Sequence, residues 1–120
     1  MKKLSAEQIQ DNWTKLIDTI EDFISDDRKE NLLKFYDDFK DRMMFAPASG
    51  REHFHNAMPG GYVEHVLHII QFSLQVKEVW EKNGANINFT DEELVFAAMH
   101  HDLGKVGDLE NDYYIPNESE

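Results

Sequence analysis

The chain has 120 residues, 41% of them apolar, with eight Phe and two Trp, so it can form one compact domain with a sizeable core. It has no Cys, which excludes disulfides and thiolate metal sites, and no apolar run of about 18 residues that would predict a membrane span. Its 24 acidic and 12 basic residues give a net charge of −12, which argues against general binding of long nucleic acid.

Two helices are expected over residues 1–45. "SAEQ" has the pattern of a capping box, with Ser5 as N-cap and Gln8 three residues later. Apolar residues then recur at helical spacing, namely Ile9, Trp13, Leu16, Ile17, Ile20, Phe23 and Ile24. A second apolar series follows "SDDRKE" and places Leu32, Tyr36, Phe39 and Met43 on one helical face. This second helix should end before Pro47, because proline disfavours helical backbone in the preceding residue.

Residues 46–61, "APASGREHFHNAMPGG", should form an irregular loop, since two prolines and three glycines interrupt any helix there. Long loops in compact domains are often functional. Arg51, His53 and His55 lie in this segment, just before "PGG", where we expect the rim of a pocket. Arg51 could bind a phosphate through two parallel hydrogen bonds, and His55 could contact a phosphate or base. The alternative is that all three are exposed loop residues.

Two further helices are expected over residues 62–107. One helix should run from about Tyr62 to Lys82. The other should start after Thr90 and stop at Gly104, and Thr90 should form a second capping box with Glu93. Strand patterns are weak throughout. The sequence therefore predicts a single all-α domain, followed at residues 108–120 by an acidic tail with five acids and no base. The start, "MKKLSAEQIQD", lacks the apolar segment of a secretory signal, so we expect a cytoplasmic protein.

Four histidines lie within the apolar pattern of these two helices: His65, His68, His100 and His101, the last followed by Asp102. Imidazole nitrogens and a carboxylate from two packed helices can converge on one divalent ion. The alternative is that each histidine is an ordinary hydrogen-bonded core or boundary residue. For His68 we favour packing over support of a metal ligand, and His100 should point away from His101 and Asp102.

Two phrases carry a family resemblance. "AAMHHDLGKVGD" and "HNAMPGGYVEHVLHI" resemble, in order and spacing, the HD superfamily of metal-dependent phosphohydrolases, over about residues 53–108. The resemblance implies an HD-domain-like helical bundle. It also implies that His65, His101 and Asp102 bind a divalent ion (Mn, Fe, Mg, Ni, Co or Zn). Lys105 matches a lysine often found near the substrate phosphate, and the alternative for Lys105 is a solvated lysine at a helix end.

The chain departs from this family at one position. The family's last ligand is an Asp on a later helix, whereas Asp108 and Asp112 lie too close to Asp102 and the sequence ends at Glu120. We favour the explanation that the sequence is part of a longer protein. Alternatively, it is a short natural form whose site is completed by an acidic-tail carboxylate or a second subunit, which is compatible with a homo-oligomer. Some virus-encoded HD proteins, including phage-type members, look similar in this region.

The resemblance implies hydrolysis of a phosphate ester, a nucleotide first of all. Asp102 would orient or deprotonate the attacking water, and Lys105 would neutralise the charge that develops on the phosphate. The alternative function is a non-catalytic module of the same fold that binds a nucleotide or regulates a partner. The missing fourth ligand favours this alternative. Hydrolysis of a generic phosphate ester distinguishes the two functions.

Overall fold

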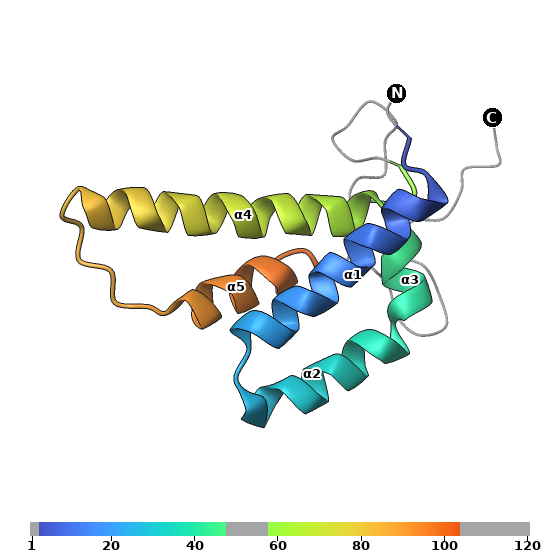
Figure 1. Ribbon diagram of the computed structural model, residues 1–120, viewed down its shortest axis with the longest axis horizontal. Helices are drawn as coiled ribbons and strands as arrows, with labels where there is room; N and C mark the ends of the chain where they lie inside the picture. The colour runs from blue at the N-terminus through green and yellow to red at the C-terminus, as the bar shows by residue number, and fades with distance from the viewer. Residues whose placement is uncertain (1–2, 48–57, 104–120) are drawn as a thin grey trace.

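The computed structural model describes residues 3–47 and 58–103, and this part of the chain is all helical, as the sequence predicted (Figure 1). None of its helices combines the length and apolar character needed to cross a membrane. In chain order the helices are α1 (Ala6–Phe23), α2 (Asp26–Asp38), α3 (Lys40–Phe45), α4 (Gly61–Lys82) and α5 (Asp91–His100).

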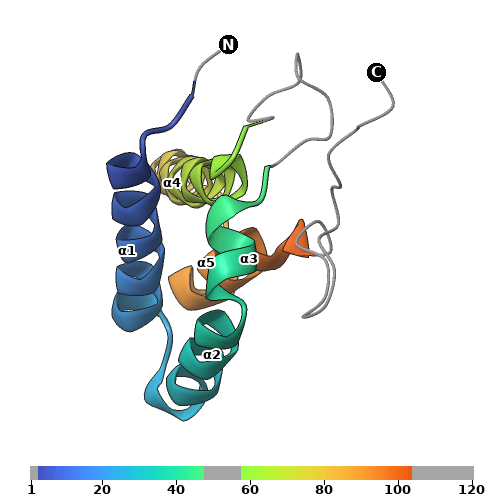
Figure 2. The same cartoon turned by 90° about the vertical axis from the view of Figure 1, so that its right-hand side faces the viewer.

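Helix α4 is the longest helix and organises the packing. It contacts α5, α1 and α3, while α1 also contacts α2, α3 and α5 (Figure 2). Every helix contributes to one buried cluster because each has an apolar face at helical spacing. The most deeply buried large side chains of this cluster are Leu16, Ile20, Tyr36, Met43, Tyr62, Val63, Val66, Val95 and Met99. The core therefore holds the start of α4 and the end of α5 close together.

Both expected capping boxes are confirmed. The Ser5 hydroxyl accepts a hydrogen bond from the N–H of Gln8 (3.1 Å), and the Gln8 side chain accepts one from the N–H of Ser5 (2.8 Å). Thr90 and Glu93 make the same exchange at the start of α5. Hydrogen bonds from the Thr90 backbone and hydroxyl lower the pKa of Glu93. These caps fix where α1 and α5 begin.

The prediction of a single second helix before Pro47 is wrong in one respect, because this segment is divided into α2 and α3 at Phe39. Phe39 leaves the helical conformation (φ −99°, ψ 6°). It follows Asp37 and Asp38, which are poor helix formers and place negative charge at the unfavourable C-terminal end of α2. The Phe39 ring still packs on Phe35, with centroids 4.8 Å apart, so the apolar face continues into α3.

The start of α4 is fixed by two backbone features. The N–H of Tyr62 donates to the carbonyl oxygen of Ala46 (2.9 Å), which joins α4 to the end of α3. Gly60 has φ +84°, and a Cβ at this position would lie 2.7 Å from Cγ1 of Ile9 in α1. Only glycine suits both the left-handed backbone and this close approach. The helix begins at Gly61, one residue before the expected start.

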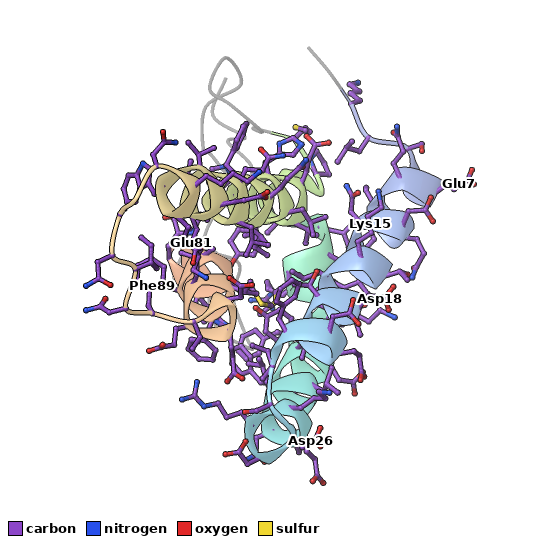
Figure 3. All side chains as sticks on the ribbon, turned by 60° about the vertical axis from the view of Figure 1, so that its left-hand side comes forward. Glu7, Lys15, Asp18, Asp26, Glu81 and Phe89 are labelled. Atoms are coloured by element: carbon purple, nitrogen blue, oxygen red, sulfur yellow. The ribbon has the colours of Figure 1, made fainter. Side chains whose placement is uncertain are left out.

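Several large apolar side chains are exposed in the second half of α4 and in the segment that follows it, namely Phe72, Val76, Val79, Trp80 and Phe89, the last of which is labelled in Figure 3. A groove of about 290 Å³ lies between the second half of α4 and the start of α5, and it is lined by Phe72, Ser73, Val76, Lys77, Trp80, Phe89 and Leu94. Lys77 crosses from α4 to α5 and donates to Asp91 (2.7 Å). The contact with Asp91 raises the pKa of Lys77.

Gly60→Ala should lower the free energy of unfolding by about 2–4 kcal/mol, because it combines a strained left-handed backbone with a clash against Ile9. Gly84→Ala is the matched control. Gly84 also has a positive φ (+87°), but nothing lies within 4 Å of its Cβ position. It should cost only the backbone term of about 1 kcal/mol. Urea unfolding of both variants measures the difference, and equal losses would contradict a role for the close approach.

Candidate metal centre

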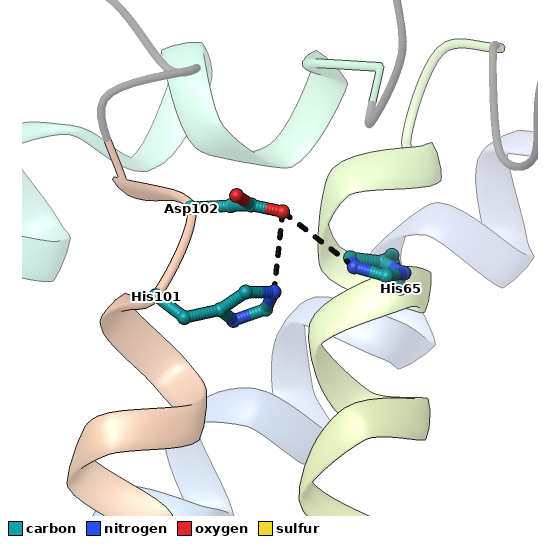
Figure 4. Close-up of side chains that lie close together, drawn as sticks. All are labelled: His65, His101 and Asp102. Carbon is teal, nitrogen blue, oxygen red and sulfur yellow. Dashed lines mark ion pairs between the residues drawn. The ribbon is translucent and has the colours of Figure 1, made fainter.

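His65, His101 and Asp102 come together between α4 and the end of α5 (Figure 4). Nε2 of His65 lies 3.6 Å from Oδ2 of Asp102, and Nε2 of His101 lies 3.1 Å from the same oxygen. One ligand atom from each of the three residues lies within 4.8 Å of the other two. The three residues named from the sequence as ligands are therefore neighbours in space.

His101 and Asp102 meet at the C-terminal end of α5. The helix ends at His100, earlier than the expected end at Gly104, and His101 is the C-cap with helical backbone angles (φ −61°, ψ −29°). Consecutive residues at such angles leave the backbone about 100° apart, so the approach of these two residues comes from their side-chain conformations and not from a break in the helical backbone. Asp102 lies in the turn after His101, and its Oδ2 lies 3.1 Å from Nε2 of His101.

A backbone hydrogen bond determines the tautomer of His101. Its Nδ1 lies 2.7 Å from the carbonyl oxygen of Ala98, and a carbonyl oxygen can only accept, so Nδ1 carries the proton and donates it. In the neutral ring, Nε2 then presents its lone pair to Oδ2 of Asp102, which is also an acceptor, at 3.1 Å. Two acceptors at this distance need a cation between them, which is either a proton or a metal ion.

The geometry fits a divalent ion. Two ligand atoms about 2.1 Å from one ion lie on the order of 3.0–3.5 Å apart at octahedral or tetrahedral angles. The distances of 3.1 and 3.6 Å from the two imidazoles to Asp102 lie at or just beyond this range. All three ligand atoms lie within 4.8 Å of one another, so an ion would draw the three side chains closer together. Two imidazoles and one carboxylate suit ions such as Mn²⁺, Fe²⁺ or Zn²⁺. The side chains are 21% (His65), 36% (His101) and 26% (Asp102) exposed, so solvent reaches the cluster.

His100 has a different role, as expected. Its Nδ1 donates to the carbonyl oxygen of Phe96 (2.7 Å), and its Nε2 accepts from the hydroxyl of Tyr36 (3.1 Å). Both ring nitrogens are therefore used within the protein. Burial lowers the pKa of His100, which keeps the ring neutral at pH 7. His100 thus joins α5 to α2 and is not a ligand.

The expectation that His68 packs into the protein is wrong, because its side chain is exposed on α4. His68 lies about 60° around the helix from His65, which is enough to turn it to solvent. Four other candidates, Arg51, His53, His55 and Lys105, lie outside the described residues, as does the acidic tail. Their expected contacts with phosphate stay predictions.

Sequence analysis missed Tyr62, which it used only as the start of a helix. Tyr62 is 1% exposed, and among the described residues its hydroxyl has no hydrogen-bond partner. Burial, and then the charge of Asp102, raises the pKa of Tyr62. The available signal was its spacing, three residues before His65 and hence on a neighbouring part of the same helix face.

No family model matches the chain, and no curated protein or solved structure matches it significantly. The assignment of a candidate metal centre therefore rests on the geometry of the cluster and on the sequence phrases around it.

Substitution of the two adjacent histidines His100 and His101 should have different effects on the free energy of unfolding. His100→Ala should lower the free energy of unfolding by about 1–3 kcal/mol, because it leaves the buried Tyr36 hydroxyl without its acceptor. His101→Ala should change the free energy of unfolding of the metal-free protein by less than about 1 kcal/mol, because its ring is partly exposed. Chemical unfolding in the presence of a chelator measures both values. A larger loss for His101→Ala than for His100→Ala would contradict these assignments.

Proposed function

We propose that the protein is a metal-dependent phosphohydrolase with the helical bundle of the HD superfamily, acting on a nucleotide or a related phosphate ester. Two independent features support this proposal. The phrases around His65 and around His101 and Asp102 resemble that family, and these three residues converge within one cluster. Phosphate esters are the ligands that a divalent ion at such a centre would attract.

The observation that carries the proposal is the pair of acceptors at 3.1 Å. The Nδ1 proton of His101 is committed to Ala98, so Nε2 and the Asp102 carboxylate together form a site for a cation. Outer hydrogen bonds of this kind orient metal-binding histidines in many proteins. His100 differs, because its Nε2 accepts a hydrogen bond from the Tyr36 hydroxyl and needs no cation.

In this function His65, His101 and Asp102 would hold the ion. A divalent ion bound there supplies Lewis-acid chemistry, since it polarises a phosphoryl oxygen and makes a water molecule more acidic. Asp102 has a second carboxylate oxygen, which could orient the attacking water and accept its proton. Lys105, three residues further on, would neutralise charge on the phosphate. Because the chain carries a net charge of −12, a local cation is also needed to attract an anionic substrate.

The metal centre can be tested with two histidines of α4. Chelator-treated protein titrated with Mn²⁺ in a calorimeter should bind about one ion per chain. His65→Ala should weaken binding by about 100-fold or more, because it removes a ligand atom. His68→Ala is the matched control, since the exposed His68 lies one turn along the same helix, and it should bind like the parent. Equal binding by the parent and His65→Ala would rule out this centre.

Catalysis can be tested with Mn²⁺-loaded protein and bis(p-nitrophenyl) phosphate, followed by a panel of nucleotides. We expect turnover, and we expect Asp102→Asn to reduce kcat by about 10²-fold or more, because an amide can neither accept the proton nor supply the ligand charge. Turnover unchanged in Asp102→Asn would contradict the assigned role. Stoichiometric metal with no turnover of any ester would instead support the non-catalytic nucleotide-binding or regulatory module.

A further inference from the structure

Two buried tyrosines near the end of α5 differ in one respect. Tyr36 and Tyr62 are each 1% exposed, and burial raises the pKa of both. The Tyr36 hydroxyl donates to Nε2 of His100 (3.1 Å). The Tyr62 hydroxyl has no partner among the described residues. Within the described part of the chain, one phenol therefore has a hydrogen-bond partner and the other has none.

A buried hydroxyl without a partner destabilises a protein, because it loses its hydrogen bonds to water and gains none in return. A phenylalanine would fill the same space without this penalty. Such an exception in an otherwise well-bonded core suggests that the hydroxyl serves a ligand. Tyr62 is also held in place at its backbone, since its N–H donates to Ala46.

The position of Tyr62 indicates which ligand this could be. It lies in the first turn of α4, three residues before His65, so the two side chains lie on adjoining parts of one helix face. The charge of Asp102 also reaches its hydroxyl and adds to burial in keeping the phenol protonated. A protonated phenol can donate one hydrogen bond to an oxygen atom. Tyr62 is therefore a protonated donor one helical turn from His65, and it lies near enough to Asp102 for that charge to act on its hydroxyl.

We propose that the Tyr62 hydroxyl donates a hydrogen bond to an oxygen atom of the phosphate group that binds at the metal centre. The identity of the ligand rests on the proposed function, whereas the burial of the hydroxyl and its lack of a partner among the described residues do not. A donor at this place would bind one phosphate oxygen. This hydrogen bond would partly offset the repulsion between the negative phosphate and the acidic protein. Tyr62 would thus contribute to binding of substrate and of inorganic phosphate.

Tyr62→Phe and Tyr36→Phe form a matched pair, because each removes a single hydroxyl from an equally buried ring. In the presence of a chelator, Tyr62→Phe should keep or raise Tm by a few degrees, since it removes an unsatisfied group. Tyr36→Phe should lower Tm by several degrees, since it breaks the bond to His100. A loss of Tm in Tyr62→Phe as large as that in Tyr36→Phe would show that the hydroxyl already has a protein partner, and would overturn the proposal.

The second readout is binding of inorganic phosphate to Mn²⁺-loaded protein by calorimetry. Tyr62→Phe should weaken phosphate binding by about tenfold or more, the effect of one hydrogen bond to a charged acceptor. Tyr36→Phe should bind phosphate like the parent, and both variants should bind Mn²⁺ like the parent. Parent-like phosphate binding by Tyr62→Phe, or no phosphate binding by a parent that binds Mn²⁺, would overturn this inference alone. A parent that binds no Mn²⁺ would overturn the proposed function, and this inference with it.

Discussion

The hydrogen bond from Nδ1 of His101 to the carbonyl oxygen of Ala98 determines what the cluster can bind. It places the only proton of the neutral ring on the side away from Asp102, and so leaves two acceptors 3.1 Å apart. The next residue back, His100, makes the same kind of bond to Phe96 but uses its second nitrogen for Tyr36. The two neighbouring histidines thus differ in what faces Nε2. Nε2 of His100 accepts a hydrogen bond from a hydroxyl, whereas Nε2 of His101 faces a carboxylate.

This bond is useful only because α4 and α5 are held together. Val66 of α4 and Val95 and Met99 of α5 belong to the same buried cluster, and this core fixes His65 opposite the end of α5. The start of α4 is further fixed by the bond from Tyr62 to Ala46 and by the close approach of Gly60 to Ile9. A cluster supported by rigid helices in this way can keep its ligand atoms near a common point before any ion binds.

Much of this could be predicted from the sequence, because helical periodicity and capping are local properties. The boxes at Ser5 and Thr90, and the direction of His100 away from His101 and Asp102, follow from residue spacing alone. The break at Phe39 was missed because the apolar face continues through it. The helix ends there after Asp37 and Asp38, two poor helix formers whose effect the apolar pattern does not show. Tyr62 was missed because nothing in its neighbours shows that a buried hydroxyl lacks a partner, which depends on the tertiary structure. The grouping of His65 with His101 and Asp102 came from the family resemblance and agrees with the geometry.

The central claim is that His101 binds an ion through Nε2 while Nδ1 stays bonded to Ala98. Nitrogen-15 NMR spectra of the imidazole rings, recorded before and after one equivalent of Zn²⁺, measure this directly. We expect Nε2 of His65 and of His101 to shift, Nδ1 of His101 to keep its proton, and both nitrogens of His100 to stay unchanged. Ring nitrogens of His101 that do not respond to Zn²⁺, or binding through Nδ1 with loss of its proton, would contradict the claim.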